Sequence, residues 1–133
     1  MNLIVVLDDK NGMLFNHRRQ SRDRVLTERI IEVCGGKLVV NAYSAGLFAG
    51  TNAELIVSED PLLTAKPGEW CFSEDRSPAS VADKIEKLVV YRWNRVYPSD
   101  LKFDFDLSAL HLLSSTDFAG YSHEKLTEEV YVP

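Results

Sequence analysis

The sequence predicts a single α/β domain with a mixed sheet, few helices and a C-terminal antiparallel hairpin. Three observations favour this class: short apolar runs rich in β-branched residues recur along the chain, one amphipathic helical pattern lies between two of them, and an alternating apolar–polar segment closes the chain. Continuous apolar runs are typical of strands covered on both faces, and alternation is typical of a half-exposed antiparallel strand.

Length and charge limit the class of protein further. A chain of 133 residues with 45% hydrophobic content suffices for one ordinary core. The net charge of −5 and the pI near 5.2 argue against a general nucleic-acid or membrane-surface binder, which usually needs a basic field. No apolar stretch approaches the roughly 20 residues that span a bilayer. The first seven residues lack the basic region and cleavage site of a signal peptide, so we expect a cytoplasmic protein.

The first third of the chain alternates strand and turn signals. Leu3–Leu7 is a continuous apolar run and predicts a central strand. Residues 8–12 supply turn chemistry ending in glycine, and Met13–Phe15 is a second short apolar stretch. Residues 16–20 are polar and basic, and we expect them to form a loop.

One helix is predicted over about Arg22–Cys34. Its apolar residues fall near helical spacing and its charged residues lie mostly on the other side. Ser21 is the expected N-cap, because its hydroxyl can accept a free amide of the first turn. The Gly35-Gly36 pair is expected to end the helix by adopting the left-handed conformation.

The remaining elements follow from shorter patterns. Strands are predicted at Lys37–Asn41 and Ala53–Val57, both buried, and at Glu69–Phe72 and Glu86–Tyr91. Short helical turns are expected at Ser44–Phe48 and Pro78–Lys84. After Tyr97 the chain is expected to turn back at residues 98–100, and Leu110–Ser115 and Lys125–Val132 are expected to form the closing hairpin.

The ordered series of elements resembles the dihydrofolate reductase family. The first strand and residues 8–13 are similar to the family's opening strand and mobile substrate-side loop, and Ser114–Val132 resembles its closing hairpin. The resemblance implies a three-layer fold. It also implies that Asp23, on the first helix, occupies the place of the family's substrate-binding carboxylate, which makes Asp23 the candidate catalytic residue.

Two cofactor motifs of that family are replaced in this chain. Asn41 and Ala42 stand where the family carries Gly and Arg of a phosphate-holding run, and Arg92 and Trp93 stand where it carries a Gly-Gly pair. Glycines there let a pyrophosphate approach the backbone at a helix N-terminus. We also expect the helix that would follow to be deleted. We therefore expect no cofactor and no NADPH-dependent folate reduction.

The densest polar segment runs from Asn16 to Arg24 and has a net charge of +3. Arginine forks near helix amides favour phosphate or carboxylate, so Arg18, Arg19 and Arg22 are candidate ligand-binding residues. The alternative is a solvated loop whose arginines pair with nearby aspartates.

A second candidate site surrounds Trp93. Arg92 and Trp93 belong to an aromatic and basic segment that could stack a ring or base. In the alternative interpretation the Trp93 side chain fills the vacated cofactor groove and the neighbouring arginines are solvated.

Other reactive side chains point to ordinary structural roles. Cys34 and Cys71 have no metal-site spacing and are expected to be reduced core thiols, and no metal site is predicted. Asp8 and Asp9 could act as a base or bind a metal, but turn formation also explains them.

The histidines and serines form no recognisable sequence motif. His111 is expected to be structural, whereas His17 and His123 are loop residues that would offer a general acid–base pair if they met in space. No G-x-S-x-G motif surrounds Ser21, Ser44 or Ser122, so the sequence does not support a serine hydrolase.

The leading hypothesis is a binding module that grips a small anionic or nucleotide-like metabolite through Arg18, Arg19, Arg22 and Arg92. The second is a divergent oxidoreductase that binds NADPH or flavin in a rebuilt groove, with Asp23 as proton donor. A third is an RNA-binding or nucleolytic module, which the net charge disfavours. A fourth is a homodimer that pairs through an edge strand such as Leu126–Val132.

Overall fold

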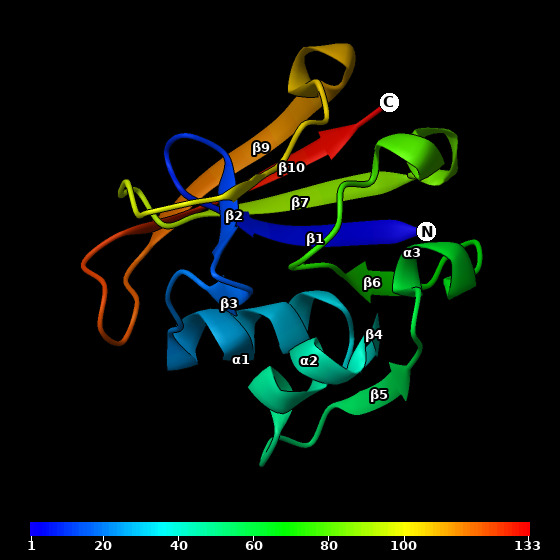
Figure 1. The fold of residues 1–133 in the computed structure, drawn as a ribbon, viewed down its shortest axis with the longest axis horizontal. Coiled ribbons are helices and arrows are strands. Elements are labelled where there is room, and N and C mark those ends of the chain that lie inside the picture. The colour runs from blue at the N-terminus through cyan, green and yellow to red at the C-terminus, as the bar shows by residue number, and fades with distance from the viewer.

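A computed structural model describes all residues, 1–133, and contains a seven-stranded sheet (Figure 1). In spatial order its strands are β5 (Glu54–Val57), β4 (Lys37–Val40), β6 (Trp70–Phe72), β1 (Asn2–Leu7), β7 (Lys87–Arg92), β10 (Leu126–Val132) and β9 (His111–Phe118). The first five are parallel, and β10 is antiparallel to both β7 and β9. The predicted mixed sheet and closing hairpin are therefore confirmed.

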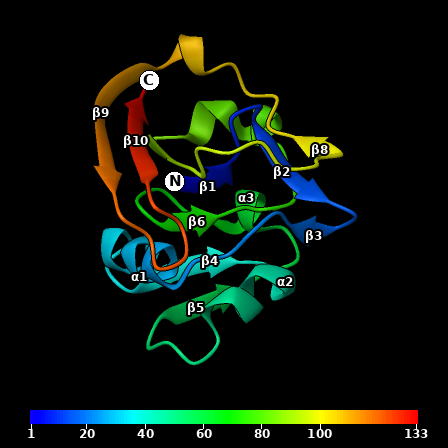
Figure 2. The same cartoon turned by 90° about the vertical axis from the view of Figure 1, so that its left-hand side faces the viewer.

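A second, three-stranded sheet stands beside the first (Figure 2). Its order is β3 (Arg18–Arg19), β2 (Gly12–Phe15) and β8 (Leu101–Lys102). Asn16 and His17 both have positive φ, at 51° and 61°, and form the two-residue turn between β2 and β3. A pair of positive φ values matches the twist of a hairpin. The prediction that residues 16–20 form a loop was therefore wrong for Arg18 and Arg19, which form β3.

The α-helices are few and short except for one. They are α1 (Arg24–Val33), α2 (Ala42–Ala45) and α3 (Pro61–Thr64), and 3-10 turns lie at Gly46–Phe48, Ala79–Lys84 and Leu107–Ala109. The sequence patterns predict no element at α3.

The helix α1 confirms the predicted segment but corrects its N-cap. Asp23, and not Ser21, caps the helix by accepting the amides of Val25 and Leu26. An ionised carboxylate is favoured there because it also complements the positive end of the helix dipole. Gly35 and Gly36 end the helix with φ of 68° and 87°, as predicted.

Two apolar cores lie on opposite faces of the large sheet, which gives the predicted three layers. On one face Ile4, Val89 and Tyr91 pack with the α1 residues Leu26 and Ile30. On the other face the following residues pack together with α3 and the segment around β8: Leu3, Val5, Leu88, Val90, Leu62 and Phe103. The alternation of β1 and β7 side chains thus fills both cores.

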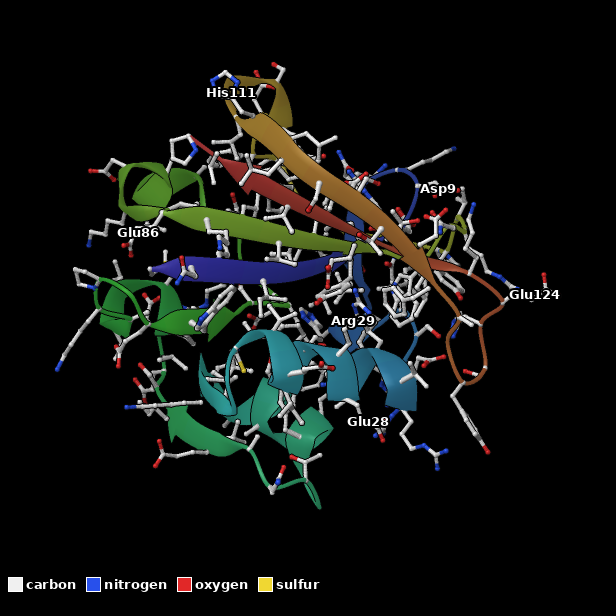
Figure 3. All side chains as sticks on the ribbon, turned by 180° about the vertical axis from the view of Figure 1, so that it is seen from behind. Asp9, Glu28, Arg29, Glu86, His111 and Glu124 are labelled. Carbon is white, nitrogen blue, oxygen red and sulfur yellow. The ribbon has the colours of Figure 1, made fainter.

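An ion pair fastens α1 to the sheet. Arg29 donates two hydrogen bonds to the Glu128 carboxylate, at 2.9 and 3.2 Å, and the Tyr91 hydroxyl donates a third at 2.8 Å. Figure 3 shows Arg29 on the side of α1 that faces the strands. Glu128 and Glu129 point to opposite faces, since Glu129 accepts from Arg92 instead.

Two expectations about sheet edges were wrong. The strand β5 is not buried, because it forms one edge of the sheet and Val57 is 56% exposed. Leu126–Val132 is not an edge strand, because β10 pairs on both sides. The other edge is β9, so a homodimer that extends the large sheet by strand pairing would have to use β5 or β9.

No α-helix lies between β7 and β9. The chain leaves β7, crosses to the small sheet at β8, and reaches β9 through one 3-10 turn. The hairpin of β9 and β10 then packs directly against β7. None of the helices is long and apolar enough to cross a membrane.

Candidate active site

A small cavity lies where β1 and β7 end and α1 begins. Its volume is about 20 Å³, which is room for about one water molecule. Its lining combines apolar and ionic side chains, including Arg19, Ser21, Asp23, Leu26, Glu74 and Trp93. Pockets for organic ligands usually measure about 300–1,000 Å³. The cleft is therefore almost completely filled by the protein's own side chains.

Asp23 is the most highly connected polar residue of this region. Its Oδ1 accepts the amides of Val25, Leu26 and Tyr121, at 2.9, 3.3 and 2.9 Å. Its Oδ2 accepts the Ser122 amide at 2.9 Å and hydroxyl at 3.2 Å, and lies 2.8 Å from Nδ1 of His123. The loop between β9 and β10 is thereby tied to the start of α1 (Figure 3).

These contacts keep the carboxylate ionised. Burial alone would raise the pKa of Asp23, but hydrogen bonds from the Tyr121 amide, His123 and the Ser122 and Leu26 amides outweigh burial. The pKa lies well below its usual range. An ionised, fully hydrogen-bonded carboxylate is poorly suited to donate a proton at neutral pH.

The same loop requires glycine at position 120. A Cβ on Gly120 would lie 2.7 Å from Oδ2 of Asp23 and 2.9 Å from the His123 carbonyl. We expect Gly120→Ala to lower the free energy of unfolding by about 1–3 kcal/mol, because the backbone must move away from Asp23. The matched control is Gly46→Ala, where a Cβ meets nothing within 4 Å and φ is −61°. Urea denaturation of both variants measures the difference, and equal stabilities would contradict the prediction.

His123 connects Asp23 to two hydroxyl groups. Its Nε2 lies 3.1 Å from the Ser21 Oγ and 3.3 Å from the Tyr97 hydroxyl. The imidazole packs against the indole of Trp93, with ring centroids 4.8 Å apart and planes inclined by 31°. The ring is therefore held both by hydrogen bonds and by stacking.

The Trp93 side chain fills the space between the end of β7 and the start of α1. Its side chain is buried, at 5% exposure, and the Tyr97 ring meets it edge-on at 6.4 Å. The Trp93 amide donates to the Leu7 carbonyl at 3.0 Å, which fixes the backbone beside β1. This geometry matches the interpretation in which Trp93 fills the groove, and an indole in this position is not available for stacking a large ring.

Two of the four candidate arginines are occupied by ion pairs. Arg19 donates two hydrogen bonds to Glu74, at 2.8 and 2.9 Å. Arg92 pairs with Glu129 at 3.1 Å and also donates to the Asp8 carbonyl at 3.2 Å. Both side chains therefore stabilise the fold.

The other two arginines have no ion-pair partner. Arg22 is exposed and lies at the small cavity. Arg18 is exposed and lines a second, open groove of about 400 Å³, whose lining shares Arg19 and Gln20 with the cavity. The groove is shared by the β2–β3 hairpin and the segment after β7, and its lining includes Phe15, Asn16, Arg18, Gln20, Tyr97 and Pro98. The four arginines do not converge on one point.

Asp8 has the turn role that the sequence allowed. Its buried carboxylate accepts the amides of Lys10 and Gly12, each at 2.8 Å, and of Tyr97 at 3.1 Å. Burial alone would raise the pKa of Asp8, but the hydrogen bonds to its carboxylate outweigh burial. The pKa of Asp8 therefore lies below its ordinary value. Asp9 is exposed.

The remaining candidates are separate from this site. His17 lies in the exposed β2–β3 turn and does not meet His123, and His111 is exposed on β9. Cys34 and Cys71 are buried free thiols, as expected, and burial raises the pKa of Cys71 to about 12. No three His, Cys, Asp or Glu side chains are grouped as metal ligands.

Comparison with known proteins identifies the fold. The structure is similar to a dihydrofolate reductase from Enterococcus faecalis complexed with NADP(H) and RAB-propyl, with a TM-score of 0.67 and 10% sequence identity. The match covers 98% of this chain and 94% of that chain. The fold is dihydrofolate reductase-like. No family model and no curated protein matches the sequence.

The dihydrofolate reductase-like fold was thus predictable, but several residues of its cleft were not identified together. The sequence singles out Asp23 and Trp93 but predicts no shared site for Ser21, Tyr97 and His123. These residues come from three distant segments. Only the Gly120–His123 turn offered a signal, since a glycine in a polar loop marks a close backbone approach.

Proposed function

We propose that this dihydrofolate reductase-like protein binds a small anionic metabolite and does not reduce folate with NADPH. The observation that favours binding is the open groove of about 400 Å³ beside the β2–β3 hairpin. Arg18 lines it without an ion-pair partner, so its guanidinium is free to pair with a phosphate or carboxylate.

Aromatic side chains in the same groove favour a ligand with a ring. Phe15 is 43% exposed, although it is large and apolar, and Tyr97 lines the groove near it. A planar group can stack on such rings while its phosphate pairs with arginine. A nucleotide-like anion would satisfy both requirements.

The filled cleft supports the proposal that folate reduction is absent. Trp93 and His123 occupy the region between β7 and α1, and the remaining cavity of about 20 Å³ is far smaller than a nicotinamide or pterin. No α-helix lies between β7 and β9 to present its amides to a pyrophosphate.

Isothermal titration calorimetry tests the proposal with inorganic phosphate, AMP and NADPH. We expect AMP to bind more tightly than phosphate, and Arg18→Gln to weaken AMP binding by about 10- to 100-fold through loss of a charge-assisted pair. The matched control is Arg95→Gln, because Arg95 is also exposed and without an ion pair but lines a different groove. Absence of binding to all three ligands would overturn the proposal, and tight binding of NADPH alone would favour the oxidoreductase hypothesis.

A further inference from the structure

Three side chains near the start of α1 form a hydrogen-bonded chain that the proposed anion site does not use. The Ser21 Oγ lies 3.1 Å from Nε2 of His123, and Nδ1 of His123 lies 2.8 Å from Oδ2 of Asp23. We propose that Ser21, His123 and Asp23 form a nucleophilic centre that hydrolyses small carboxylic esters. This arrangement of nucleophile, base and orienting carboxylate is recognised by geometry, whatever the order of the residues in the chain.

The proton positions follow from the charge on Asp23. The carboxylate is buried and surrounded by donors, so it accepts a hydrogen bond from His123 and the Nδ1 atom carries the proton. The Nε2 atom of the neutral imidazole is then an acceptor. It faces the Ser21 hydroxyl, which is the group that a general base must deprotonate.

The imidazole is held in the orientation that this chemistry requires. Trp93 stacks against one face of the ring, and the amides of Tyr121 and Ser122 anchor Asp23 at 2.9 Å each. A base whose rotation is restricted loses little entropy when the reaction begins. The Tyr97 hydroxyl lies 3.3 Å from the same Nε2 atom and helps to position the ring.

The surroundings of Ser21 limit the substrate. The cavity beside the hydroxyl holds only about 20 Å³ and is lined partly by Leu26 and Trp93, so the acyl group must be small. The exposed Arg22 follows the serine directly, and its backbone amide has no hydrogen-bond partner in the chain. The amide after the nucleophile is a frequent donor to the oxyanion of acyl transfer, and it is free to act here.

The reaction is balanced by these groups and one water molecule. The Ser21 Oγ attacks the ester carbonyl carbon while its proton moves to Nε2 of His123. The carbon–oxygen bond to the alcohol then breaks, and the alcohol oxygen takes that proton. Water attacks the acyl-serine, gives one proton to Nε2, and releases the carboxylic acid as Ser21 recovers its proton.

Covalent labelling tests the centre. The protein is treated with a fluorophosphonate, and the labelled residue is located by peptide mass spectrometry. We expect one adduct, on Ser21, which is lost in Ser21→Ala and kept in the control Ser114→Ala on the exposed strand β9. An unlabelled wild-type protein, or an adduct on any other residue, would overturn the proposal.

Hydrolysis of p-nitrophenyl acetate supplies an independent readout. We expect kcat to fall about 10²- to 10⁴-fold in His123→Asn, because the general base is lost. Circular dichroism establishes that the variant is folded. A folded His123→Asn protein with wild-type kcat would overturn the proposal, whatever the outcome of the anion-binding experiment.

Discussion

Replacing Asp23 with asparagine is expected to lower the free energy of unfolding by about 3 kcal/mol at neutral pH. The asparagine side chain keeps the shape of the aspartate side chain, but an NH2 donor replaces one carboxylate oxygen. That donor then faces either the Ser122 amide and His123 or the amides of Val25 and Tyr121. Urea denaturation at pH 7 measures the loss.

Asp23→Asn should also change how the stability of the protein depends on pH. Because the pKa of folded Asp23 is depressed below the ordinary value of 3.8, its stabilising contribution is present above that value and is lost as pH falls through 3.8 toward the folded pKa. Asp23→Asn should therefore lose less stability between pH 5 and pH 3 than the wild type. Some acid sensitivity should remain, since the pKa of Asp8 is also lowered.

Asp9→Asn provides the matched control for this experiment. Asp9 is exposed and its carboxylate accepts no hydrogen bond, so its replacement should change stability by less than about 0.5 kcal/mol. If the two asparagine variants had equal stabilities at pH 7, Asp23 could not be the anchor of the loop between β9 and β10.

Replacing Trp93 with alanine is expected to lower the free energy of unfolding by about 3–5 kcal/mol, as for other buried aromatic residues. The change removes the rings' contacts with His123 and Tyr97 and enlarges the small cavity beside α1. Thermal denaturation measures the loss of stability. Ligand binding to the enlarged cavity provides a second measurement.

Free indole should partly restore the stability of the Trp93→Ala protein. An enclosed apolar cavity binds a ligand of the missing shape, and binding to the folded state alone raises the melting temperature. Trp70→Ala is the control, because Trp70 lies at the opposite end of the strands and lines an open groove. A melting temperature that does not respond to indole in Trp93→Ala would show that the side chain does not fill an enclosed space.

Much of the fold was predictable because its signals are local. The apolar runs of β1 and β7 and the helical spacing of α1 each lie within a dozen residues, and Gly35-Gly36 ends the helix where expected. The errors occurred where short patterns compete. Asp23 is the N-cap in place of Ser21 because its charged carboxylate accepts the amides of Val25 and Leu26, so that the helix begins two residues later than predicted. The Asn16-His17 turn made a hairpin from a segment that looked like a loop.

The sequence by itself determined the scaffold. The elements follow in the order of the dihydrofolate reductase-like fold, which the structure confirms. This conclusion depends only on residue type and spacing, which local sterics and the burial of apolar side chains convert into structure.

Only the tertiary structure decided which polar groups are free and which are paired. Glu74 neutralises Arg19 from 55 residues away, and His123 meets Asp23 from 100 residues away. Such contacts form after the strands have paired, and they depend on loop conformations that periodicity does not encode. For that reason some of the candidate arginines pair with glutamate and others have no ion-pair partner. For the same reason Ser21, which no sequence motif marks, lies beside His123.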